Sequence, residues 1–180
     1  MFTHAFVGLA ATAAFAPRGG VRLYAVAAIA SAAPDLDVLL HGLGIQYEDA
    51  WGHRGMTHSL LFAAILAIGL GSLVRGGSSS RAGPGWFVRV ALLFPIIASH
   101  GALDAFTDGG LGIAFLAPFD HTRYFAPWGP LPVPHFGLAS MFTAYGGRVM
   151  LLEMLWVWLP AALLAGVMLT TRWRRHRRTG

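Results

Sequence analysis

The feature that most constrains this chain is its series of long apolar runs. The clearest occupies residues 149–171, which is long enough to cross the hydrocarbon core of a bilayer, since crossing takes about 20 helical residues. Four further runs precede it, at residues 2–16, 21–40, 57–74 and 86–103. Backbone groups in lipid must find hydrogen-bond partners within their own segment, so these runs predict helices. The expected fold is all-α, a polytopic membrane bundle of about five apolar helices.

The composition supports a membrane rather than water as the solvent. Apolar residues make up 56% of the chain and charged residues only 12%, whereas soluble domains carry about 25% charged residues. We expect one integral-membrane domain over residues 1–171 and a basic cytoplasmic tail over residues 172–180. A nucleic-acid partner is not expected, because most of the net charge of +5 lies in this tail. Whether residues 2–16 cross the membrane fully is left open by their length.

The arginines predict an orientation, because positive flanks remain on the cytoplasmic side. Five crossings with the N-terminus outside and the C-terminus inside place ten of the thirteen arginines inside. All eight acids and seven of the eight histidines then fall at outer helix ends or in outer loops. The sequence therefore predicts a multi-pass protein of the cytoplasmic (inner) membrane whose polar chemistry faces the outer side.

Histidines and aspartates recur at these outer ends, each embedded in apolar sequence. Ionisable groups beside hydrocarbon are costly unless they share a cation or pair with one another. The chain has no cysteine, so the available ligands are nitrogen and oxygen, which suit zinc, with manganese or iron as alternatives. We expect one to three divalent ions. The predicted metal ligands are His4, Asp35, Asp37, His53, His58, His100, Asp104 and Asp108.

Local spacing gives more specific expectations for the motif "SHGALDAFTDGG". His100 and Asp104 are four residues apart, which places them on one face of a helix and one turn from each other. Asp108 extends that face, and the glycines after it are expected to end the helix. A hydrogen-bonded His100–Asp104 pair without any metal remains an alternative.

The motifs "PDLD" and "HRGMTHS" are expected to lie at helix junctions. Pro34 disfavours helix at the residue before it, so the chain is expected to turn there and project Asp35 and Asp37. Thr57 is expected to cap the next helix, with His58 in its first turn. Arg54 is expected to remain free to pair with a phosphate or carboxylate of a substrate. The alternative for both aspartates is simple helix capping.

These motifs resemble those of the YdjM-like family, described as LexA-binding, inner-membrane-associated hydrolases and as membrane-bound metal-dependent hydrolases. The resemblance covers residues 4–119 and rests on the order of an early "TH", "APDLD", "HRGMTHSL" and "SHGALDAFTDGG" followed by "APF". It implies an inner-membrane location, metal-dependent hydrolysis and a regulatory protein partner. More distantly, the H-x-x-x-D pair is similar to the helical zinc-dependent phospholipases C and P1-type nucleases. The chain lacks their N-terminal tryptophan and second H-x-x-x-E pair.

The leading hypothesis is a metal-dependent hydrolase that cleaves a phosphoester of a membrane lipid or another amphiphilic substrate. Metal-activated water supplies the nucleophile, Asp37 or Asp104 acts as general base, and Arg54 stabilises charge on phosphoryl oxygens. The alternative is a non-enzymatic metal-binding or metal-transport membrane protein that uses the same ligands. Haem ligation would leave the aspartates without a role.

Overall fold

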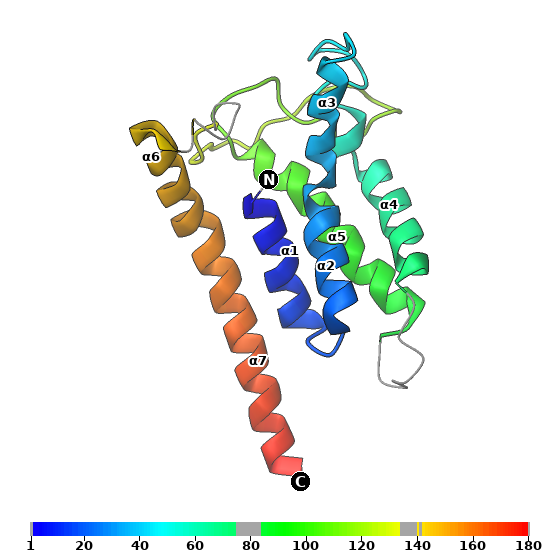
Figure 1. Ribbon diagram of the computed structural model, residues 1–180, viewed down its shortest axis with the longest axis vertical. Coiled ribbons are helices and arrows are strands. Elements are labelled where there is room, and N and C mark those ends of the chain that lie inside the picture. Colours follow the sequence, from blue (N-terminus) through cyan, green and yellow to red (C-terminus); the bar gives the residue numbers. More distant parts are fainter. Residues whose placement is uncertain (1, 75–83, 134–139, 141, 180) are drawn as a thin grey trace.

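The structure is a computed structural model that describes residues 2–74, 84–133, 140 and 142–179. The helices lie beside one another as rods, and loops cover one end of the bundle (Figure 1). Within the described residues there is no β-strand, only two isolated bridges, Thr107–Leu131 and Ile113–Tyr124. The predicted all-α bundle of about five apolar helices is therefore confirmed. The connection between the apolar runs 57–74 and 86–103 lies almost entirely outside the described residues.

The first two rods form a close pair. Helix α1 (Phe2–Phe15) is followed after a short turn by α2 (Gly20–Ala32), which runs on through a 3-10 segment η1 (Ala33–Asp37) into α3 (Val38–His41). The expected turn at Ala33 is wrong, because Pro34 lies in the first turn of η1, where its missing N–H costs no hydrogen bond. The rod tightens there instead of bending away, so Asp35 and Asp37 project from a continuous helix.

The remaining rods are α4, α5 and a long C-terminal helix. Helix α4 (Leu60–Leu73) follows a 3-10 turn η2 (Met56–His58), and α5 (Trp86–Ala105) contains Pro95. The last rod consists of α6 (Ala144–Glu153), a π-helical turn η4 (Met154–Trp158) and α7 (Leu159–Thr179). The basic tail expected after residue 171 is thus the continuation of α7.

Three rods are long and apolar enough to cross a membrane: Gly20–His41, Trp86–Ala105 and Ala144–Arg175. Helices α1 and α4 have 14 residues each. At a rise of 1.5 Å per residue they reach about 21 Å, which is short of a hydrocarbon core about 30 Å thick. The run 57–74 yields a shorter helix than expected because α4 begins only at Leu60. Five full crossings and the orientation of the termini therefore stay predictions.

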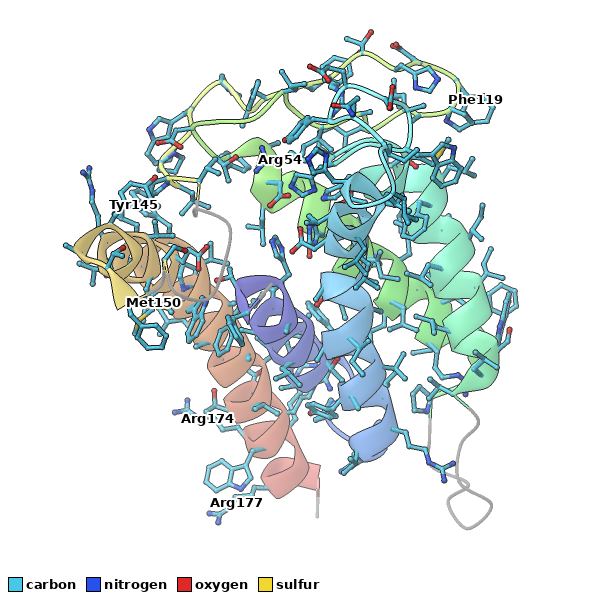
Figure 2. The ribbon with its side chains drawn as sticks, turned by 45° about the horizontal axis from the view of Figure 1, so that its top comes forward. Arg54, Phe119, Tyr145, Met150, Arg174 and Arg177 are labelled. Carbon is cyan, nitrogen blue, oxygen red and sulfur yellow. The ribbon has the colours of Figure 1, made fainter. Side chains whose placement is uncertain are left out.

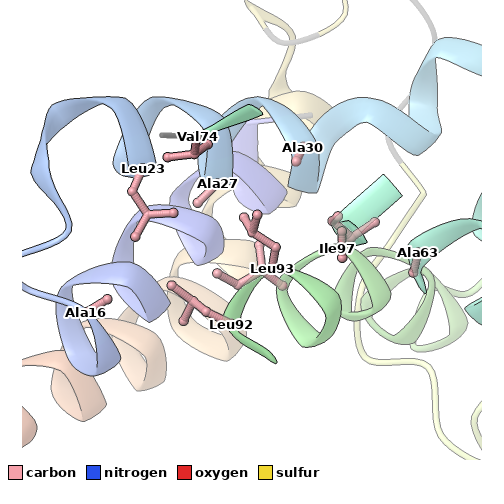
Figure 3. Packing of buried hydrophobic residues seen from close by; sticks show 11 residues of the cluster. Ala16, Leu23, Ala27, Ala30, Ala63, Val74, Leu92, Leu93 and Ile97 are labelled. Carbon is pink, nitrogen blue, oxygen red and sulfur yellow. The ribbon is translucent and has the colours of Figure 1, made fainter. Parts of the chain in front are cut away.

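Small and aliphatic side chains fill the interior between α1, α2, α4 and α5. Leu23, Leu93 and Ile97 are almost fully buried, and alanines such as Ala27 and Ala67 allow the helices to approach closely (Figure 3). Large apolar side chains point outward instead. Val21 is 85% exposed and Phe87 is 80% exposed. This arrangement suits a bundle surrounded by lipid.

Two loops form the cap over one end of the bundle (Figure 1). The first connects α3 to η2, and the second follows α5. Arg123 joins them, since its Nη1 donates to the carbonyl of His53 at 3.0 Å and its Nη2 to that of Tyr47 at 3.1 Å. The backbone of the second loop also pairs with the first, as Ala114 N–H donates to the carbonyl of Arg54. These contacts fix the segment 53–58 against the end of α5.

Helices α1 and α2 touch most closely at Gly8. A Cβ at this position would lie 2.6 Å from the carbonyl oxygen of Ala27 and 2.9 Å from the hydroxyl of Ser31. Gly69 on α4 has nothing within 4 Å of the same position. The two glycines therefore form a matched pair for testing the packing.

We predict that Gly8→Ala destabilises the protein by about 1–3 kcal/mol, because the added methyl group separates two well-packed helices. Gly69→Ala should leave stability unchanged or raise it by up to about 1 kcal/mol, since alanine favours helix. Thermal unfolding of both variants in the same detergent measures the difference. An equal response of the two variants would contradict the close α1–α2 contact.

Candidate metal centre

Most of the polar residues singled out from the sequence converge where the cap meets the helix ends, at the place that Arg54 marks in Figure 2. Helix α1 brings His4, η1 brings Asp35 and Asp37, and α5 brings His100 and Asp104. The loop and turn before α4 bring His53, Arg54 and His58. Every ionisable side chain that is buried in the described part of the chain belongs to this cluster: His4, Asp37, Arg54, His58, His100 and Asp104.

Four of these residues have ligand atoms that all lie within 4.8 Å of one another: Asp35, His58, His100 and Asp104. His100 Nε2 lies 3.2 Å from Asp35 Oδ1 and 3.6 Å from Asp104 Oδ2. His58 Nε2 lies 3.5 Å from Asp104 Oδ2. Two imidazole nitrogens and two carboxylates form a donor set that suits four-coordinate zinc.

His100 is held in the orientation that a metal ligand needs. Its Nδ1 lies 2.7 Å from the carbonyl oxygen of Ser31, and because a carbonyl only accepts, Nδ1 must carry the hydrogen. In the neutral ring Nε2 then has a lone pair, and it faces the carboxylates of Asp35 and Asp104. That contact is favourable only with a positive charge between these atoms, either a proton or a metal cation. A backbone partner of this kind commonly fixes a metal-binding histidine.

His58 shows the same division of roles between its nitrogens. Its Nδ1 lies 3.0 Å from Thr57 Oγ1 and 3.2 Å from Asp37 Oδ2. Thr57 donates its own hydrogen to Asp37 Oδ2 at 2.6 Å, so its oxygen is left to accept from Nδ1 of His58. The buried Nε2 has no hydrogen-bond partner and faces Asp104. An unpartnered buried nitrogen at this position fits a cation among the four residues.

Asp37 is a hydrogen-bond centre for the segment 53–58. Its oxygens accept from His53 Nδ1 at 2.7 Å, from the backbone N–H of Arg54 at 3.2 Å and from Thr57. Its side chain is completely buried. Asp37, His53 and His58 form a second group with ligand atoms within 4.8 Å. Because the groups share His58, an ion in each would require both nitrogens of that ring, and Asp37 is better placed to orient His58.

His4 joins the cluster at its edge. Its ring stacks on that of His100, with centroids 3.7 Å apart, and its Nε2 lies 3.4 Å from Asp104 Oδ1. Its Nδ1 is buried without a hydrogen-bond partner. The first apolar helix therefore does bring His4 to the other predicted ligands, although it lies outside the group of four.

Arg54 is not free, contrary to expectation. Its side chain is buried, its Nη1 donates to the carbonyl of Gly109 at 2.8 Å, and its Nε lies 3.7 Å from Asp104 Oδ2. Its backbone has a φ of 66°, a left-handed conformation that turns the chain so that its N–H reaches Asp37. The guanidinium thus serves as an internal counter-charge for Asp104.

Asp108 lies outside both groups. Helix α5 ends at Ala105, before the glycines that were expected to stop it, and Asp108 Oδ1 accepts from the backbone N–H of Val133 at 2.9 Å. Because the helix ends early, Asp108 does not extend the face that carries His100 and Asp104. The structure gives it a role in holding the cap loop.

The roles of two serines near the cluster were not predicted from the sequence. Ser31 accepts from His100 and donates its hydroxyl to the carbonyl of His4 at 2.7 Å, but no motif singles it out. Ser59, rather than Thr57, caps α4 by accepting from Phe62 N–H, so His58 precedes the helix. A serine directly before the apolar run at Leu60 was a readable capping signal.

The side chains of the cluster are unequally buried. The side chains of His58 and His100 have no exposed surface, whereas 16% of Asp35, 12% of Asp104 and 10% of His4 remain exposed. At Gly101, one residue beyond His100, a Cβ would lie 3.0 Å from the carbonyl of His58, so the absence of a side chain lets η2 close over the buried face. The exposed part of the cluster is therefore its carboxylate side together with the edge of His4.

The chain is similar to known inner membrane proteins. The YdjM inner membrane protein family matches residues 1–176. The chain belongs to this family. Inner membrane protein YbcI of Escherichia coli (strain K12) is 39% identical over 156 residues, which cover 86% of each chain. The predicted family and inner-membrane location are confirmed. No solved structure matches this YdjM-family chain, so the similarity to phospholipase C and P1 nuclease stays a prediction.

We predict that Asp104→Asn weakens zinc binding by at least about 100-fold. Losing a residue that only supports a ligand weakens metal binding by up to about 100-fold, and losing a ligand itself should cost at least as much. Asp108→Asn makes the same chemical change four residues later and should leave zinc affinity unchanged. Competition titration against a zinc chelator measures both. Similar losses in the two variants would contradict the group of four.

We predict a pH dependence that zinc removes. Burial lowers the pKa of His58, but the nearby carboxylates of Asp104 and Asp37 outweigh it and raise that pKa from 6.5 to about 9. When a chelator removes metal, the pairing of protonated His58 with Asp37 and Asp104 contributes its full stabilisation below pH 6.5. This stabilisation is lost as the pH rises through about 9.

The measurement is the melting temperature from pH 6.5 to 9 with EDTA, compared between wild type and His58→Gln. The wild type should lose more stability over this range than the variant. Zinc-loaded wild type, in which the ion takes the place of the proton, should not show that loss. Parallel curves for wild type and variant in EDTA would refute the assignment.

Proposed function

We propose that this YdjM-family protein is a metal-dependent hydrolase that cleaves a phosphoester in a lipid or another amphiphilic substrate. The observation that carries the proposal is the group of Asp35, His58, His100 and Asp104, with two buried imidazoles and two partly exposed carboxylates. Such a set holds a cation firmly on one side and leaves the other side for a substrate. A divalent cation there, zinc by preference, supplies an acidic water and stabilises negative charge on a phosphoryl oxygen.

The chain's own residues divide the remaining tasks. Asp37 has its oxygens occupied by donors from the segment 53–58, so it orients His58 instead of taking a proton. The exposed side offers Asp104 Oδ1 and His4 Nε2, 3.4 Å apart, as the pair that accepts a proton from water. Arg54 balances the charge of Asp104 from the buried side.

An apolar cavity supports an amphiphilic substrate. It has a volume of about 330 Å³ and lies between α1 and the α2–η1 rod. Ala33 and Leu36 on its wall flank Asp35 in sequence, and Phe2 and Ala5 flank His4. A hydrocarbon chain in this cavity would place an attached headgroup beside the exposed carboxylates, and it would enter sideways from the bilayer.

The distribution of charge supports an outward-facing site. The cluster occupies the end of the bundle that carries the cap, and α7 ends in its arginines at the opposite end (Figure 1). Positive segments remain on the cytoplasmic side, so we place the cluster at the outer face of the inner membrane.

The alternative of a metal transporter is less well supported. An ion path needs polar groups at several depths, whereas the buried ionisable residues of the described chain all belong to one end. Zinc uptake into proteoliposomes that His100→Ala abolishes, with no hydrolysis of any phospholipid, would favour transport.

The test of the hydrolase is purified protein in nanodiscs of Escherichia coli lipids, stripped with chelator and then reloaded with zinc. Phosphoester cleavage, followed by mass spectrometry of the lipids, should be lost on stripping and restored on reloading. Asp104→Asn should lower the rate by at least about 100-fold, and Asp108→Asn should not. Full activity in the metal-stripped protein would reject the proposal.

The cavity generates a separate prediction. Ala32→Trp should fill it and raise KM for long-chain phospholipids about 10-fold or more, since burying several methylenes contributes about 0.8 kcal/mol each. Short-chain substrates should be cleaved with little change. Val21→Trp, at the other end of the same helix and 85% exposed, is the control. Equal effects of Ala32→Trp on long-chain and short-chain substrates would show that the cavity does not bind the hydrocarbon chain of the substrate.

A further inference from the structure

A second cavity lies at the end of the bundle opposite the metal centre. It has a volume of about 590 Å³ and is enclosed by the turn between α1 and α2, the start of α5 and the last turns of α7. Three arginines line it: Arg18, Arg172 and Arg175. Arg172 Nη2 also donates to the carbonyl of Phe15 at 3.3 Å, which holds α7 against the end of α1.

None of the eight acidic side chains lines this cavity. All eight acids of the sequence lie in the described part of the chain, and all are at the other end of the bundle. Asp35, Asp37 and Asp104 belong to the metal centre, and Glu153 accepts from Thr3 near the start of α1 at 2.6 Å. The others, Glu48, Asp49, Asp108 and Asp120, lie in the cap loops. The cavity therefore has a strong positive potential.

The rest of the cavity wall is apolar. It includes Phe15, Val88, Leu169 and Trp173. These side chains continue the outward apolar surface of the bundle, where Val21 and Phe87 are also exposed. The cavity thus sits at the edge of the apolar belt, with arginines toward water and hydrocarbon-like surface toward the membrane interior.

We propose that this cavity binds the headgroup of an anionic glycerophospholipid from the leaflet at that end. Guanidinium groups bind phosphate oxygens through paired N–H donors, and basic cavities between membrane helices suit acidic headgroups. The acyl chains lie along Leu169 and Val88. The bound lipid joins α7 to the α1–α2 turn, in addition to the Arg172–Phe15 bond. This site is independent of the metal centre and of its activity.

The experiment titrates the full-length protein in detergent with phosphatidylglycerol or phosphatidylcholine and counts bound lipids by native mass spectrometry. Wild type should retain phosphatidylglycerol in preference to phosphatidylcholine. Arg18→Gln with Arg175→Gln should weaken phosphatidylglycerol binding roughly 25-fold, about 5-fold for each arginine removed. The matched control is Arg22→Gln with Arg174→Gln, which removes one charge from each of the same two segments outside the cavity. Figure 2 shows Arg174 on the side of α7 away from α1.

A third variant separates the cavity from general charge attraction. Val88→Trp fills the cavity without changing its charge and should also weaken phosphatidylglycerol binding. Unchanged zinc binding and chromatographic behaviour confirm that each variant is folded. Equal losses in the two arginine pairs, full binding by Val88→Trp, or equal retention of both lipids by wild type would each overturn the proposal.

Discussion

The structure depends on one electrostatic constraint: carboxylates buried at the end of an apolar bundle must be matched by positive charge. The side chain of Asp37 is fully buried, and only 12% of the Asp104 side chain and 16% of the Asp35 side chain remain exposed. Unmatched, such groups would cost several kcal/mol each. Arg54 supplies one fixed positive charge, and the imidazoles supply others only when they carry a proton or share a cation. The cluster of imidazoles and carboxylates is therefore also a means of holding α1, η1, η2 and α5 together.

Hydrogen bonds at the polar end of the bundle also explain how the segments around the cluster are held in place. Asp37 draws the segment 53–58 onto η1 through three kinds of donor: imidazole, hydroxyl and backbone N–H. Ser31 then connects α2 to both His4 and His100. Since His58 and His100 each have Nδ1 committed to a fixed acceptor, Nε2 of each ring is aimed at the carboxylates without further adjustment. Backbone and hydroxyl groups thus orient the rings, and the carboxylate side remains partly exposed.

Much of this could be read from the sequence, because membrane helices and ionisable residues beside them are strongly constrained. The apolar runs gave the helices, and the position of His100 and Asp104 on one helical face gave the centre of the cluster. Arg54 and Asp108 were misplaced because their surroundings depend on long-range contacts with Gly109 and Val133, which no spacing rule contains. Ser31 was missed because its role lies largely in its carbonyl group, which every residue possesses.

The shortness of α1 and α4 has a consequence for the surrounding bilayer. A helix of 14 residues is too short for the full hydrocarbon thickness, and local thinning of the bilayer is one response to such a mismatch. Thinning near α1 would bring lipid headgroups toward the level of His4 and Asp104. In the proposed hydrolase, a lipid ester would then meet the cluster without being lifted out of its leaflet, and hydrophobic mismatch itself would help to deliver the substrate.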